Sequence, residues 1–149
     1  MAYFNLGMAL NNSAHYVEAA QRFLEAKERF LVGSELWGKA TAYAFNMLVQ
    51  EECAEVAKPE WWNDEGLKAL SASVVRAAPD EVEANRMRAE VLSGQLRAWE
   101  AGPRSAAELR EAAAHYDRVA ALCHAPAMKA KYAELEASCR RQAEAMLQR

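Results

Sequence analysis

The residue types that most often perform catalysis or bind metals are scarce in this chain. Three histidines and three cysteines occur among 149 residues. Cys123 and His124 are adjacent, and with Cys139 and His115 they are the nearest approach to a zinc-ligand set, but their spacing matches no standard zinc pattern. A nucleophilic Cys–His pair needs proximity in space, which adjacency in sequence does not provide. We therefore expect no metal, no cofactor and no catalytic residue.

The known motifs of enzymes are also missing from the sequence. It has no glycine-rich phosphate loop, no HExxH and no GxSxG. The carboxylates of Glu51, Glu52 and Glu55 form a cluster, but glutamates at this spacing on a helix are usually exposed to solvent. The sequence therefore predicts a protein that is not an enzyme.

Charge and cysteine content exclude further classes of function. The net charge is −3 and basic residues are scattered, which argues against a nucleic-acid-binding face. No run is long and apolar enough to insert into a membrane. The odd number of widely spaced cysteines, without a CxxC, indicates reduced thiols, so we predict a cytoplasmic protein.

Helix-forming residues dominate the chain, and the 6 glycines and 4 prolines fall at intervals. These intervals predict an all-α fold of about seven helices. Because the breaks are short, consecutive helices should pack antiparallel. The predicted helices are Ala2–Asn11, Ala14–Leu31, Glu35–Ala57, Glu65–Ala78, Glu81–Glu100, Ala106–Cys123 and Pro126 to the C-terminus.

Helix-start signals support several of these boundaries. Ser34 is a candidate N-cap. Ser105 with Glu108 fits a capping box, and Asp80 with Glu83 has similar spacing.

The opening hairpin has an unusual distribution of small and large residues. Gly7 has no side chain and Ala19 has almost none, so two helices can approach closely there. A glycine inside a helix costs about 1 kcal/mol relative to alanine, which calls for a packing reason. The residues of the two facing surfaces are Tyr3, Leu6, Gly7 and Leu10, and Tyr16, Ala19, Phe23 and Ala26.

In the order and type of these eight residues the segment resembles the tetratricopeptide repeat (TPR), a helix–turn–helix unit of about 34 residues. One departure is Leu31, which stands near a place where the family often has proline. The resemblance implies a single TPR-like domain, a right-handed α-α superhelix of antiparallel hairpins. The expected hairpins span about 2–31, 35–78 and 81–123, with a final helix over 126–149.

The resemblance also implies a function. TPR-like stacks bind a peptide or a partner helix on a concave face, so we expect a protein-interaction module, scaffold or adaptor. It could belong to a larger complex or to a longer repeat array. The first helices lack the family's carboxylate clamp, because Phe4 and Met8 stand where its Lys and Asn would be.

The candidates for partner binding lie on the first, third and fifth predicted helices, at positions off the packing faces. The two tryptophans of the loop after the third helix are possible aromatic anchors or hydrophobic plugs. The groove candidates are Phe4, Asn5, Met8, Asn12, Lys39, Tyr43, Asn46, Gln50, Asn85, Arg86 and Arg88, and the possible anchors are Trp61 and Trp62.

Three alternatives remain open. The chain could be a generic helical bundle with a repeat-like start. It could be an adaptor like the soluble attachment proteins of vesicle fusion, which bind through an edge or the outer surface. It could also be a small helical enzyme or a metal-dependent regulator.

Overall fold

The computed structural model describes residues 2–148, which form seven α-helices and no strand. The helices are α1 (Ala2–Asn12), α2 (Tyr16–Arg29), α3 (Glu35–Leu48), α4 (Asp64–Ala77), α5 (Val82–Ser93), α6 (Ala106–Leu122) and α7 (Pro126–Leu147), with a short 3₁₀ helix at Glu51–Cys53. The predicted all-α class is confirmed.

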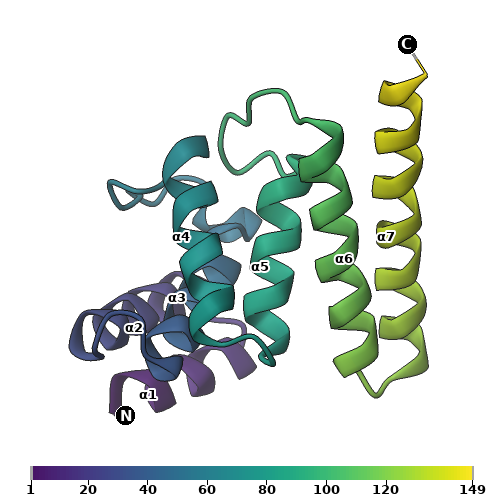
Figure 1. Cartoon of the computed structure of the whole chain (residues 1–149). Coiled ribbons are helices and arrows are strands. Elements are labelled where there is room, and N and C mark those ends of the chain that lie inside the picture. The colour runs from purple at the N-terminus through teal and green to yellow at the C-terminus, as the bar shows by residue number, and fades with distance from the viewer. Residues whose placement is uncertain (1, 149) are drawn as a thin grey trace.

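Consecutive helices pack against each other in chain order, and α5 also contacts α3. The array runs from α1 to α7, and the two chain ends lie at opposite sides of it (Figure 1). None of the helices in residues 2–148 combines the length and the hydropathy needed to cross a bilayer.

The close approach predicted at Gly7 is present between α1 and α2. A Cβ atom on Gly7 would lie 2.8 Å from Cε1 of Phe23. Phe23 is 0% exposed and its ring also contacts the rings of Phe4 and Tyr43, with centroids 5.4 and 5.2 Å away. The first three helices therefore join around one aromatic cluster, and the absent side chain at Gly7 leaves the room that Phe23 fills.

Two of the three predicted helix starts are confirmed. The Ser34 side chain accepts a hydrogen bond from the backbone N–H of Trp37, and Ser105 forms a capping box with Glu108. At α5 the prediction is wrong, because the N-cap is Glu81 and makes no side-chain cap bond.

Both residues of the expected capping box at α5 have other partners. Asp80 forms an ion pair with Arg118 of α6. Glu83 accepts a hydrogen bond from Asn46 of α3.

The third helix ends at Leu48, nine residues before the predicted end at Ala57. After it the chain turns so that Cys53 is buried next to α2. Lys58 holds this turn, because its Nζ donates to the carbonyls of Cys53 and Val56. Burial of an apolar side chain has overridden the helix propensity of the segment here.

The fifth helix ends at Ser93 rather than at Glu100. Gly94 follows with φ of 65°, the left-handed conformation that glycine adopts at helix C-termini. Arg104 completes this end, since its Nη2 and Nε donate to the carbonyls of Val91 and Leu92 at 2.9 and 3.1 Å. The other predicted boundaries differ from the structure by no more than two residues.

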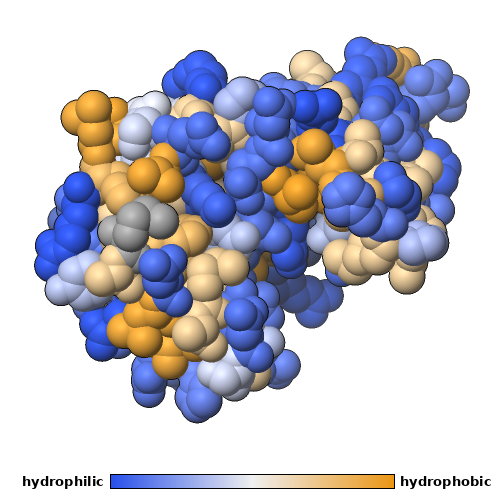
Figure 2. Space-filling view, turned by 90° about the horizontal axis from the view of Figure 1, so that it is seen from below, coloured by the Kyte–Doolittle hydropathy of each residue, from blue (hydrophilic) through white to orange (hydrophobic). Residues whose placement is uncertain are grey.

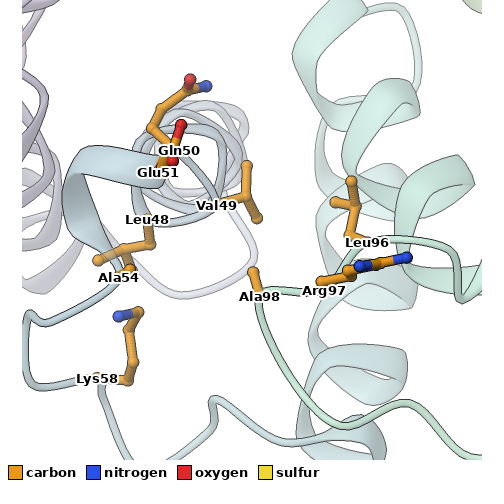
Figure 3. A pocket seen from close by; sticks show the side chains of 9 residues that line it. All are labelled: Leu48, Val49, Gln50, Glu51, Ala54, Lys58, Leu96, Arg97 and Ala98. Atoms are coloured by element: carbon orange, nitrogen blue, oxygen red, sulfur yellow. The ribbon is translucent and has the colours of Figure 1, made fainter.

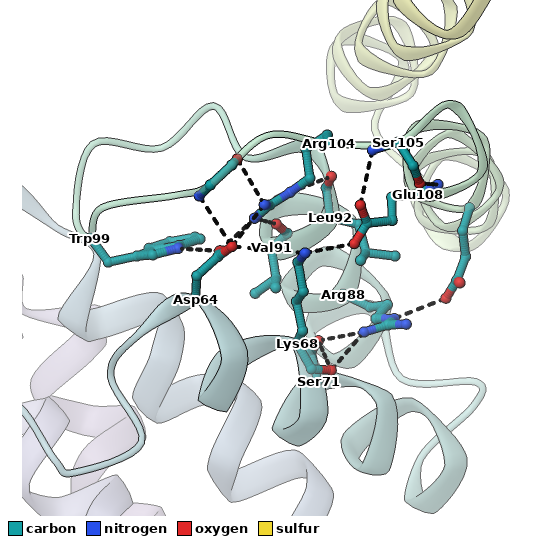
Figure 4. A network of polar contacts seen from close by, with 12 residues as sticks. Asp64, Lys68, Ser71, Arg88, Val91, Leu92, Trp99, Arg104, Ser105 and Glu108 are labelled. Atoms are coloured by element: carbon teal, nitrogen blue, oxygen red, sulfur yellow. Dashed lines mark hydrogen bonds and ion pairs between the residues drawn. The ribbon is translucent and has the colours of Figure 1, made fainter.

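Arg104 also fixes the loop between α5 and α6 to the start of α4 (Figure 4). Its Nη2 and Nη1 donate to the two carboxylate oxygens of Asp64 at 2.6 and 2.9 Å. Asp64 accepts two more hydrogen bonds, from Trp99 Nε1 and from the N–H of Gly102. The hydrogen bonds from Arg104 hold the pKa of Asp64 well below its usual value. This network keeps a twelve-residue loop close to the helices.

Candidate functional site

Polar side chains meet where α3 lies next to α5. Asn46 of α3 donates from Nδ2 to a carboxylate oxygen of Glu83 on α5. Glu83, Arg86 and Glu90 follow each other at helical spacing, and Arg86 reaches both carboxylates, at 3.5 Å and 2.9 Å. We call Asn46, Glu83, Arg86 and Glu90 the inner-face cluster.

This cluster lies on the side of α5 that is turned away from α4 and α6. Arg88 marks the opposite side, because it donates to Ser71 of α4 and to Glu111 of α6 (Figure 4). A helix turns about 100° per residue, which places the α5 residues of the cluster across the helix from Arg88. We call the surface of α3 and α5 that carries the cluster the inner face.

Figure 2 shows that the molecular surface is hollowed between the part that covers the first helices and the part that covers the last two. Hydrophobic residues gather over the first helices and in a smaller patch near the middle of this view, and hydrophilic residues cover most of the remaining surface.

Two tyrosines adjoin the cluster on either side. Tyr43 of α3 stacks on Phe23, and burial with the nearby carboxylates of Glu83 and Glu81 raises the pKa of Tyr43 to about 12. On the other side lies Tyr132 of α7, which is buried. Burial raises the pKa of Tyr132, and Arg86 opposes that rise.

The charges in the cluster are only partly balanced. Burial raises the pKa of Glu83; Arg86 opposes this, and the carboxylates of Glu90 and Glu81 add to it. Burial lowers the pKa of Arg86, but Glu90 and Glu83 outweigh that effect and raise it. Arg86 therefore stays charged between two carboxylates, while Glu83 carries a less favourable charge.

Two acceptor oxygens of the cluster are buried without a hydrogen-bond donor among residues 2–148. They are Oδ1 of Asn46, whose residue is 2% exposed, and Oε2 of Glu90, whose side chain is 12% exposed. A buried polar atom without a partner costs about 1–3 kcal/mol, so such atoms are uncommon in folded proteins.

The candidates on α1 occupy different environments. Asn5 and Asn12 are exposed, and Met8 is half-buried. Phe4 was expected off the packing face, but it is buried and its ring packs edge-on against Phe23. The aromatic cluster takes Phe4 because the helix turns it toward α3 rather than toward solvent.

Lys39 and Tyr43 share one side of α3 with Asn46, and Gln50 follows two residues after the end of the helix. Lys39 places its Nζ 5.3 Å from the ring centroid of Phe4. Gln50 donates from Nε2 to the carbonyl of Asn46 and is half-buried. Tyr43 lies between them along the helix.

On α5 the structure separates the three candidates. Arg86 belongs to the inner-face cluster, whereas Arg88 faces α4 and α6. Asn85 is 3% exposed, donates to the carbonyls of Pro79 and Glu81, and contacts His115 of α6. The expected position of Asn85 and Arg88 on the inner side is therefore corrected, because both side chains bridge the other side of α5.

Trp61 and Trp62 pack against the helices of the protein. Both are half-buried and contact the two hydrophobic clusters on either side of α3. The indole Nε1 of Trp62 donates to the carbonyl of Ala98 at 3.0 Å. Lys27 lies 5.8 Å from the ring centroid of Trp61. Their structural role is plain from these contacts.

A cavity of about 440 Å³ opens between the end of α3 and the loop that follows α5 (Figure 3). Val49, Leu96 and Ala98 form apolar walls, and Lys58 and Arg97 lie at opposite ends of it. Glu51 also lines the cavity, and the Nζ of Lys58 is already bonded to the carbonyls of Cys53 and Val56.

Among residues 2–148 no three side chains of His, Cys, Asp or Glu come together as metal ligands. Cys53 and Cys139 are buried, and burial raises the pKa of both thiols. A raised thiol pKa lowers the fraction of reactive thiolate.

Comparison with protein-family models, curated protein sequences and solved structures found no match to this chain. The resemblance of the opening hairpin to the TPR therefore stays a prediction.

Sequence reasoning missed Glu83, Glu90 and Tyr132 as members of this region. A signal for the first two was present, because positions 83, 86 and 90 repeat at three- and four-residue spacing on one helix face. No local pattern could have linked Tyr132 to them, since it comes from α7.

Proposed function

We propose that this chain is a non-catalytic protein-interaction scaffold whose inner face holds a peptide or a helix of a partner protein. The observation that supports this most is the position of Asn46, Glu83 and Arg86. Asn46 lies on α3, and Glu83 and Arg86 lie on α5. Asn46 and Glu83 are 37 residues apart in the sequence, yet the three side chains form one polar strip on the side of α5 away from α4 and α6.

Further features agree with this proposal. The TPR-like order of residues in the first hairpin implies the same class of function. The free cysteines fit a reducing compartment such as the cytoplasm. The cavity between the end of α3 and the loop after α5 borders Gln50, at the end of the same polar strip, and offers an apolar anchor site.

The proposal is tested with peptides selected from a random twelve-residue library on the wild-type chain. Their affinity is measured by fluorescence anisotropy for wild type, for Gln50→Trp on the inner face and for Ser73→Trp on α4 as the matched control. Both replaced side chains are half-buried and make one or two hydrogen bonds within the chain.

We expect Gln50→Trp to weaken peptide binding at least tenfold and Ser73→Trp to leave it unchanged, with circular dichroism showing that both variants fold. Failure to select any peptide, or loss of binding in Ser73→Trp alone, would refute an inner-face binding site.

A second candidate function is an adaptor that docks through its edge or outer surface. The turn between α2 and α3 favours it, because Leu31 and Val32 are 82% and 75% exposed. Serine at both positions should change the free energy of unfolding by less than about 0.5 kcal/mol. Partners captured from a native extract by wild type and by Gln50→Trp, but not by the serine variant, would favour this adaptor over the inner-face scaffold.

A further inference from the structure

The chemistry of a bound segment can be inferred from the charges of the inner-face cluster, and this inference rests on the function proposed above. The carboxylates of Glu83 and Glu90 flank the single guanidinium of Arg86, and the carboxylate of Glu81 lies near Glu83. Arg86 is already shared between Glu83 and Glu90, so it has little capacity to attract an anionic ligand. The local charge is negative and is partly shielded from water.

A second observation is independent of charge. Asn46 is 2% exposed, its Nδ2 is directed at Glu83, and its Oδ1 has no donor among residues 2–148. Exchanging the amide oxygen and nitrogen would place two acceptors against each other at Glu83, so the orientation is fixed. Glu90 Oε2 is a second buried acceptor without a donor among residues 2–148. Both atoms call for N–H donors, which the described residues do not supply.

We propose that the inner-face cluster receives a lysine or arginine side chain from a bound protein segment. A basic side chain supplies both missing properties. It adds a second positive charge beside Glu83 and Glu90, which share the one guanidinium of Arg86, and it carries N–H donors of the kind that Asn46 and Glu90 lack. An acidic segment would meet like charges. A metal ion fits less well, since no three metal-ligating side chains converge among residues 2–148.

The hydroxyl-bearing rings on either side suit such a guest. Tyr43 and Tyr132 border the cluster, and their hydroxyl groups are protonated at neutral pH, as tyrosine hydroxyls ordinarily are, so each oxygen can accept an N–H donor.

The test uses the peptides selected on the wild-type chain, together with copies in which each Lys or Arg is replaced by Gln. Affinities are measured for wild type, for Glu83→Gln and Glu90→Gln, and for Glu65→Gln as the control. Glu65 is exposed on α4, so its replacement makes the same change in net charge far from the cluster. Glutamine at position 83 keeps an oxygen that can accept from Asn46, which favours an intact fold.

We expect the selected peptides to contain Lys or Arg, and each inner-face substitution to weaken binding about tenfold, as is usual when one partner of a partly buried charge pair is removed. Glu65→Gln should change it less than twofold, and added salt should weaken wild-type binding.

Two results would overturn the inference. If peptides bind the inner face but remain equally tight after Lys or Arg is replaced by Gln, or after Glu83→Gln and Glu90→Gln, the basic guest is wrong while the scaffold stands. If no peptide is selected, the scaffold itself is wrong and the inference falls with it.

Discussion

Replacing Gly7 with alanine separates tertiary packing from helix propensity, because the two effects have opposite signs. Alanine in a helix interior is favoured over glycine by about 1 kcal/mol. The new Cβ, however, would lie 2.8 Å from Cε1 and 2.9 Å from Cδ1 of Phe23. Overpacking of this kind costs about 1–3 kcal/mol. Phe23 is 0% exposed and is held between Phe4 and Tyr43, so its ring cannot yield easily. The overpacking cost less the gain in helix propensity gives a net destabilisation of up to about 2 kcal/mol.

The assay is equilibrium unfolding in urea, followed by circular dichroism at 222 nm. Gly102→Ala is the control, because a Cβ there would lie 3.5 Å from Asp64 Oδ2, an ordinary contact. In a Phe23→Leu background the cost of Gly7→Ala should shrink, since the ring edge is gone. A Gly7→Ala variant more stable than wild type would show that α1 and α2 do not approach as described.

Two further predictions concern the polar contacts around α4 and α6. Arg104 lowers the folded pKa of Asp64, so the ion pair stabilises the fold fully above about pH 5 and loses its contribution as the pH falls. The difference in unfolding free energy between wild type and Asp64→Asn should therefore shrink between about pH 5 and pH 2. A difference that grows on acidification would contradict this. Ser105→Ala removes the hydrogen bond to the N–H of Glu108 and should cost about 1 kcal/mol in urea unfolding, and no measurable loss would argue against the capping box.

The sequence was sufficient where local chemistry decides the structure. Short breaks and helix formers predicted seven helices, and Ser34 and Ser105 act as the caps that their types suggest. Gly7 was recognised because a glycine inside a helix needs a packing partner. The hairpin pattern placed Phe23 on the facing surface of the second helix together with Tyr16, Ala19 and Ala26, but it did not single out Phe23 as the residue that contacts Gly7.

Long-range contacts explain the errors in the fold. Nothing near Gly94 in the sequence indicates that Arg104 will cap α5, and the burial of Cys53 depends on α2. Prediction from helix propensity alone therefore placed the ends of α3 and α5 too late in the sequence. Asp80 also lost its expected cap role to an ion pair with Arg118 on another helix.

Long-range contacts also explain why only some of the candidate residues were placed correctly from the sequence. Asn46 and Arg86 were chosen by their place on helix faces, and they do lie in one cluster. The choice of Asn85 and Arg88 failed, because a rotation of one or two residues around α5 decides which neighbour a side chain meets. The carboxylate of Glu83 was assigned to a helix cap, although the Asn46 amide of α3 donates a hydrogen bond to it.

The most direct test of the inner-face account is a map of backbone amide chemical shifts during titration with a selected Lys- or Arg-containing peptide. The account predicts that the largest changes fall on α3 and α5 around Tyr43, Asn46 and Arg86, with smaller changes near Tyr132. Changes concentrated on α4 and α6, or at the turn between α2 and α3, would contradict it.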